Sequence, residues 1–119
     1  MSAQHAEYGE TPVIPRPDRT PAALRAACAV VAPHLLAAYD QAKEQALAEA
    51  LEHDSIKPLH AYLSHWAALI EIERHPETAK AYHRAEYLAR TANTPDEARG
   101  HLITASSIYR DAARAVRAA

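Results

Sequence analysis

The sequence predicts an all-α protein, an antiparallel bundle of about five helices with a flexible, proline-rich N-terminal tail. Three observations predict this fold class. Alanine, the strongest helix former, supplies 29 of the 119 residues. Glycine, which tight hairpin turns require, occurs twice, and phenylalanine is absent. Apolar residues recur at spacings of three and four along most of the chain, which is the period of a helix with one buried face. The length suits one domain.

The first 19 residues differ in composition from the rest. They hold Gly9, Pro12, Pro15 and Pro17 and few apolar residues. Proline removes backbone donors and favours extended conformations. We therefore expect residues 1–19 to form a disordered or extended tail that a partner could order, and residues 20–119 to form a single helical domain.

Two helices are predicted before residue 54. Thr20 and Pro21 open the first, because threonine can cap free amides and proline suits the first helical position. Pro33 is predicted to open the second, which runs to about His53. The side predicted to pack comprises Leu36, Tyr39, Ala42 or Lys43, Ala46, Leu47, Ala50 and Leu51.

The third helix is predicted to be central. Asp54 and Ser55 precede it as caps, Pro58 lies in its first turn, and it ends near Arg74. Its apolar residues cover so many sides that neighbours on several faces are expected. They are Leu59, Tyr62, Leu63, Trp66, Leu69 and Ile70. We expect Trp66 in the core, and Tyr62 and Tyr82 at its edge with hydroxyls reaching solvent.

Two more helices complete the predicted domain. His75 and Pro76 open the fourth, which extends to about Ala92. Thr94 and Pro95 open the fifth as a capping box. A packing seam is predicted along this last helix, at Ala98, Leu102, Ala105, Tyr109, Ala112 and Val116.

No catalytic, cofactor or metal site is predicted. The eight histidines include no two that are three or four residues apart, the spacing with which one helix holds a metal ion. Cys28 lies among alanines and valines, so we expect an inert core thiol. A lone cysteine cannot form an internal disulfide, which favours the cytoplasm. The first residues lack the apolar segment of a signal peptide, and no stretch is long and apolar enough to span a membrane.

Two charged features suggest partners. The second helix is acidic, and the last carries arginines at spacings of four and three along one side. Solvated faces explain both features most simply, since cations near a helix C-terminus also stabilise the helix. As candidate partner-binding residues we take Asp40, Glu44, Glu49, Glu52, Arg110, Arg114 and Arg117.

Four stretches of the chain carry a family resemblance. They are the run from Arg19 to Ala27, the run from Ala32 to Tyr39, Ile56–Leu59 and His65–Trp66. Together they resemble a family of small uncharacterised helical proteins from high-GC actinobacteria. The resemblance covers about residues 19 to 76. Members are sometimes encoded beside toxins of the RelE/ParE type, so the resemblance implies an antitoxin-like partner.

The leading hypothesis is a non-enzymatic protein-binding module that masks a small basic protein, the product of a neighbouring gene. The second is a DNA- or RNA-binding regulator that uses Arg99, Arg110, Arg114 and Arg117, although the net charge of −2 argues against it. The third is a small-molecule binder or enzyme with an interhelical pocket lined by Trp66, Tyr62, Tyr82 and nearby histidines. The fourth is a homo-oligomer packed along the last helix.

Overall fold

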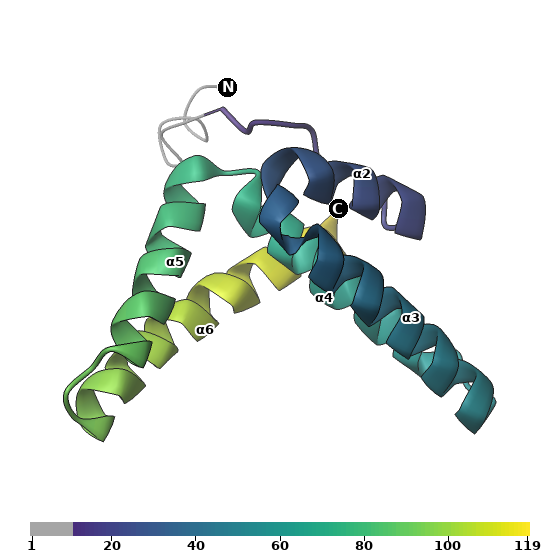
Figure 1. Cartoon of the computed structure of the whole chain (residues 1–119). Coiled ribbons are helices and arrows are strands. Elements are labelled where there is room, and N and C mark those ends of the chain that lie inside the picture. The colour runs from purple at the N-terminus through teal and green to yellow at the C-terminus, as the bar shows by residue number, and fades with distance from the viewer. Residues whose placement is uncertain (1–10) are drawn as a thin grey trace.

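The computed structural model describes residues 11–119, and within them it is all-helical, as predicted (Figure 1). Five α-helices and one 3₁₀ turn follow one another with short connections. They are α2 (Pro21–Val31), η1 (Pro33–Leu35), α3 (Leu36–His53), α4 (Lys57–Glu73), α5 (Pro76–Arg90) and α6 (Pro95–Ala118). Each α-helix except α3 has a proline in its first turn, where a missing backbone donor costs nothing.

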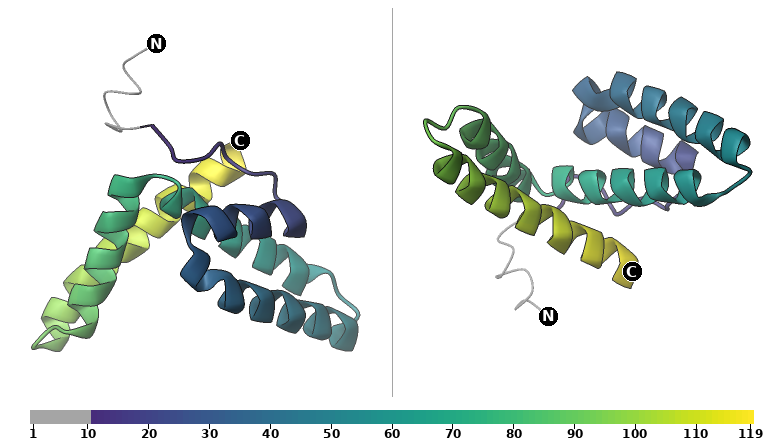
Figure 2. Two further views of the ribbon diagram at one scale, coloured as in Figure 1. Left: turned by 45° about the horizontal axis from the view of Figure 1, so that its top comes forward. Right: turned by 90° about the horizontal axis from the view of Figure 1, so that it is seen from below.

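The helices form two arms that diverge from a common apex (Figure 1). One arm is the antiparallel pair α3 and α4, with α2 packed against its inner end, and the other is the pair α5 and α6. The view from below shows the same separation, with α6 meeting α4 near the apex (Figure 2). The arrangement is therefore more open than the bundle that the sequence predicted.

The prediction that the third helix is central is confirmed. Helix α4 contacts α2, α3, α5 and α6. Trp66 and Ile70 face a core shared with Leu24 and Tyr39, which are fully buried. A second, smaller core is formed by Ala68, Ile72, Ala79 and Ala112, where α4 meets α5 and α6. Alanines let the helices approach closely in this second core.

Two tyrosine hydroxyls form a hydrogen-bonded chain in the larger core, the one that contains Leu24, Tyr39 and Trp66. The hydroxyl of Tyr62 donates to that of Tyr39, which donates to the carbonyl of Pro21 at 2.7 Å. Trp66 meets the ring of Tyr39 edge-on, with the ring centroids 5.1 Å apart. Tyr62 is therefore buried together with its hydroxyl, and the prediction that this hydroxyl reaches solvent is wrong. The hydroxyl of Tyr39 takes the place of water as the hydrogen-bond partner of Tyr62.

Three leucines predicted to pack are exposed. Leu47 and Leu51 on α3 expose 49% and 76% of their surface, and Leu102 on α6 exposes 54%. Each arm is only two helices thick at its outer end, so a helix there has one neighbour and one buried face. On α3 the buried residues are Tyr39 and Ala46, and Leu36 and Ala42 pack partly buried against the same core, whereas Leu47 and Leu51 do not.

Two predicted helix caps are confirmed and one is corrected. The side chains of Thr20 and Thr94 accept hydrogen bonds from the amides three residues later, at 3.2 and 3.1 Å. Asp54 does not begin α4. It ends α3 in the left-handed conformation, with φ of 49°, and the hydroxyl of Ser55 accepts from the amide of Lys57.

Residues 11–19 run as an irregular segment against the end of α4. The amide of Val13 donates to the carbonyl of Arg74 at 2.8 Å. The rest of the predicted tail, with His5 and Gly9, lies outside the described residues. Within the described part, no helix has both the length and the apolar character to cross a membrane.

Candidate interaction surface

An ion cluster lies at the apex of the two arms. Glu71 on α4 accepts hydrogen bonds from Arg16 at 2.8 and 2.9 Å and from Arg74 at 2.9 and 3.3 Å. Glu71 and Arg74 each expose only 7% of their surface. Burial raises the pKa of Glu71, but the hydrogen bonds and charges of the two arginines outweigh burial and lower the pKa to about 2.

The same cluster holds the N-terminal segment in place. Arg74 donates from Nη1 to the carbonyl of Ile14 at 3.0 Å, in addition to its bonds with Glu71. Arg16 itself belongs to the segment. The cluster therefore ties residues 13–16 to α4, which gives it a structural role.

An open groove of about 950 Å³ lies beside this cluster. Its apolar wall includes Ile72 and Ile108. Its charged lining consists of three basic and three acidic residues, namely Arg16, Arg74, Arg114, Glu71, Glu77 and Asp111. Because the signs balance, the groove does not select a ligand by charge. The predicted pocket residues Trp66, Tyr62 and Tyr82 do not line it.

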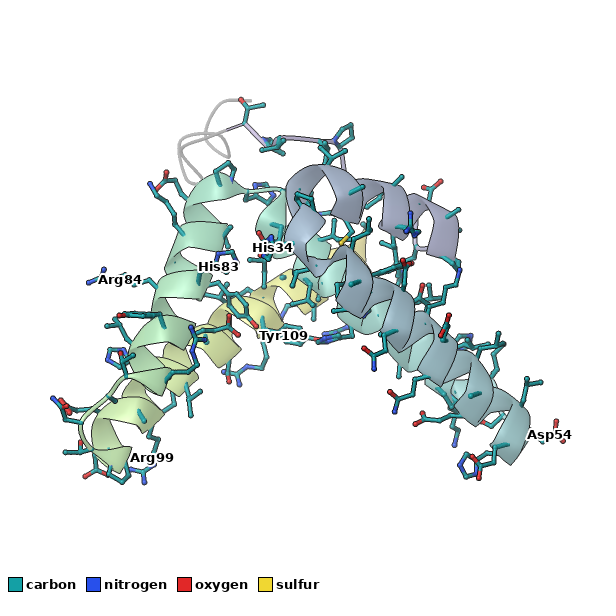
Figure 3. The ribbon with its side chains drawn as sticks, in the orientation of Figure 1. His34, Asp54, His83, Arg84, Arg99 and Tyr109 are labelled. Atoms are coloured by element: carbon teal, nitrogen blue, oxygen red, sulfur yellow. The ribbon has the colours of Figure 1, made fainter. Side chains whose placement is uncertain are left out.

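Two histidines form polar contacts between α4 and the second arm. His65 on α4 lies 2.8 Å from the hydroxyl of Tyr109 on α6, and His83 on α5 lies 2.6 Å from Glu73 on α4. Figure 3 shows His83 and Tyr109 on the side of their arm that faces the other arm. Burial lowers the pKa of His65, which favours the neutral ring. Each histidine therefore links α4 to the second arm.

In residues 11–119, no three histidine, cysteine or carboxylate side chains are gathered to hold a metal ion. Cys28 is fully buried, and its thiol donates to the carbonyl of Ala32 at 3.5 Å. Burial raises the pKa of this thiol, which makes it a poor nucleophile. The prediction that Cys28 lies in the core is confirmed.

The four acidic candidates on α3 do not form one surface. Asp40 makes a two-pronged ion pair with Arg25 on α2, with both distances 2.8 Å. Glu49 accepts a hydrogen bond from Gln45. Glu44 and Glu52 are exposed, and no described residue pairs with them. Asp40 thus helps to hold α2 on α3, and Glu44, Glu49 and Glu52 face solvent.

Of the four arginine candidates on α6, two form ion pairs within the helix and two form none with the described residues. Arg114 pairs with Asp111 at 3.1 Å, and Arg99 pairs with Asp96 at 2.7 Å. These are exposed pairs within one helix, which contribute little to stability. Arg110 and Arg117 are exposed and have no ion pair with the described residues. Of the three arginines of the predicted stripe, only Arg114 is therefore neutralised by the helix that carries it.

Large apolar side chains gather at the outer ends of both arms. On the first arm Leu47, Leu51 and Ile56 expose 49%, 76% and 61% of their surface. On the second arm the corresponding residues are Tyr87, Leu102 and Ile103, which expose 57%, 54% and 60%. Clustered exposed apolar residues of this size are typical of surfaces that bind another macromolecule.

The two arms also differ in charge. The segment 20–75, which builds the first arm, holds four basic and seven acidic side chains, and the segment 76–119 holds seven basic and five acidic ones. The first arm is thus acidic and the second basic.

Comparison with known proteins places the chain in a family. Residues 12–117 match a family of unknown function, DUF6247. The chain belongs to DUF6247. No curated protein and no solved structure matches it significantly.

Two features of this DUF6247 chain escaped the sequence reasoning. Arg16 belongs to the segment predicted to be a disordered or extended tail, yet it bonds Glu71 across 55 residues. Glu71 is not among the residues singled out from the sequence, yet it accepts hydrogen bonds from both Arg16 and Arg74. The available signal was the pair Glu71 and Arg74, at a spacing of three, directly after the apolar run 66–70 of α4. A charge in such a place needs a partner.

Proposed function

We propose that this chain is a non-enzymatic protein-binding module. The observation that carries the proposal is the exposure of six large apolar side chains in two clusters, one at the outer end of each arm. The buried ion pairs and the hydroxyl chain serve the fold, so the polar groups of the core have structural partners. Among residues 11–119, the exposed clusters have none.

The partner we propose is a small basic protein of the RelE/ParE toxin type, encoded beside the chain, which would make the chain antitoxin-like. The support is the sequence resemblance together with the acidic character of the first arm. Glu44 and Glu52 supply unpaired negative charge beside Leu47 and Leu51. Such a surface attracts a basic partner over a distance, and its leucines add apolar contact area.

The proposal is tested by purifying the tagged chain from cells of the organism that encodes it. We expect one stoichiometric protein partner with the wild type, and its loss with Leu51→Asp. The matched control is Ala48→Asp, a change at an exposed site on the same helix that adds the same charge but removes no large apolar group. Recovery of no partner, or equal recovery with Leu51→Asp, contradicts the proposal.

A nucleic-acid-binding regulator is the second candidate, favoured by the unpaired Arg110 and Arg117 on the basic arm. Its binding to DNA or RNA would weaken steeply with salt, because the bound phosphates release counterions. Two unpaired arginines on this helix are few for such a surface, so we rank it below protein binding. Titration of the purified chain against duplex DNA and single-stranded RNA at several salt concentrations decides between them.

A further inference from the structure

Two exposed helix stripes on opposite arms match each other in spacing and charge. On α3, Glu44, Leu47 and Leu51 lie at spacings of three and four residues, so they share one side of the helix. On α6, Ile103, Ser106 and Arg110 lie at the same two spacings. All six residues are exposed, and neither charged residue has an ion pair with the described residues.

The order of the residues is reversed between the two stripes. Along α3 the acidic residue comes first and the leucines follow, whereas along α6 the isoleucine comes first and the arginine follows. Each stripe separates its apolar end from its charge by seven residues, about 10 Å along a helix. If the helices run antiparallel, one register places Leu51 against Ile103 and Glu44 against Arg110.

The two stripes lie on different arms that diverge from the apex, so they cannot meet within one molecule (Figure 1). We propose that they meet between molecules, and that α3 of one copy packs antiparallel against α6 of a second copy in this register. This inference rests on the protein-binding function proposed above and names a second copy of the chain as one partner. The opposite charge excess of the two arms favours the same pairing.

A contact between two different patches is heterologous. It continues from copy to copy unless the rotation between copies closes a ring. Association through these stripes therefore leaves an unused α3 stripe and an unused α6 stripe at the ends of every open assembly. The average mass should rise with protein concentration, beyond that of a dimer unless a two-membered ring closes.

The test is light scattering on the purified chain alone, across a range of concentrations at low salt. We expect the average mass of the wild type to rise above the monomer mass of 13.0 kDa. Glu44→Arg and Arg110→Glu should each return the mass to that of the monomer, because every contact then opposes like charges. An equimolar mixture of the two variants, and the double variant carrying both changes, should associate again.

Two charge reversals serve as controls. Glu49 lies five residues after Glu44, about 140° around the helix, so Glu49→Arg changes the charge of α3 away from the stripe. Arg84 on α5 points outward from the second arm (Figure 3), so Arg84→Glu changes the charge of that arm alone. Both controls should associate like the wild type.

A wild type that stays monomeric at every concentration overturns the inference. So does association that persists in Glu44→Arg and Arg110→Glu, or that is lost equally in the two controls. These outcomes concern the chain alone, so they are separate from the recovery of a different protein partner. The inference can fail while the proposed function stands.

Discussion

Replacing Glu71 by glutamine should destabilise the protein more than the loss of any exposed charge. Glutamine keeps the shape of the side chain and removes its negative charge. Arg74 is then left buried with its hydrogen bond to the carbonyl of Ile14 but without the carboxylate that neutralises it. Removal of one partner from a buried ion pair typically costs about 3–5 kcal/mol. Because Arg16 is partly exposed and can turn towards water, we expect a loss at the lower end, about 3 kcal/mol.

The lowered pKa of Glu71, which arises from the same two arginines, agrees with this magnitude. The fall from its ordinary value of 4.5 to about 2 corresponds to about 3 kcal/mol of stabilisation of the folded state. Since the folded pKa is the lower one, this stabilisation is fully present above about pH 4.5 and is lost as the pH falls towards 2. The stability difference between the wild type and Glu71→Gln should therefore shrink over that window.

The assay is urea denaturation followed by the fluorescence of Trp66, the single tryptophan, which is buried in the core. The matched control is Glu77→Gln, whose carboxylate pairs with Lys80 on an exposed surface and should contribute less than about 1 kcal/mol. A loss below 1 kcal/mol in Glu71→Gln at pH 7 would refute the reasoning. A difference from the wild type that stays constant between pH 5 and pH 2 would refute it as well.

Three further changes test other parts of the fold by the same assay. Gly100→Ala should stabilise the protein by about 0.5–1 kcal/mol, because the glycine lies exposed inside α6 with open space where a Cβ would stand; a loss of stability would contradict this. Tyr39→Phe should cost about 1–3 kcal/mol, since it leaves the hydroxyl of Tyr62 and the carbonyl of Pro21 without their partner, and an unchanged midpoint would show that other groups or water replace it. Thr94→Ala should cost about 1 kcal/mol by removing the cap of α6, whereas Thr94→Asn should retain most of the stability.

The helices themselves were predictable from local sequence. The prolines at the helix starts and the threonine caps act within four residues of the chain, so the boundaries follow from nearby residues. The central place of α4 followed from its apolar residues on several faces. These features depend on the properties of one helix at a time.

The open arrangement of the arms could not be predicted in the same way. Whether Leu51 is buried depends on a third helix covering that side of the arm, and the periodicity of α3 does not say how many neighbours it has. Spacing alone predicted a packed leucine, but the structure exposes 76% of it. The ion cluster could not be predicted from local sequence either, because Arg16 and Glu71 are 55 residues apart.

The central claim is that the exposed ends of the arms bind protein. Size-exclusion chromatography with light scattering tests it most directly, on the chain alone and after co-expression with the product of a neighbouring gene. We predict a stable complex containing both proteins in equal numbers, with Leu51→Asp releasing the partner and Ala48→Asp retaining it. Two proteins that elute separately at their own masses would contradict the antitoxin-like assignment. A complex that Leu51→Asp leaves intact would contradict the assignment of the surface.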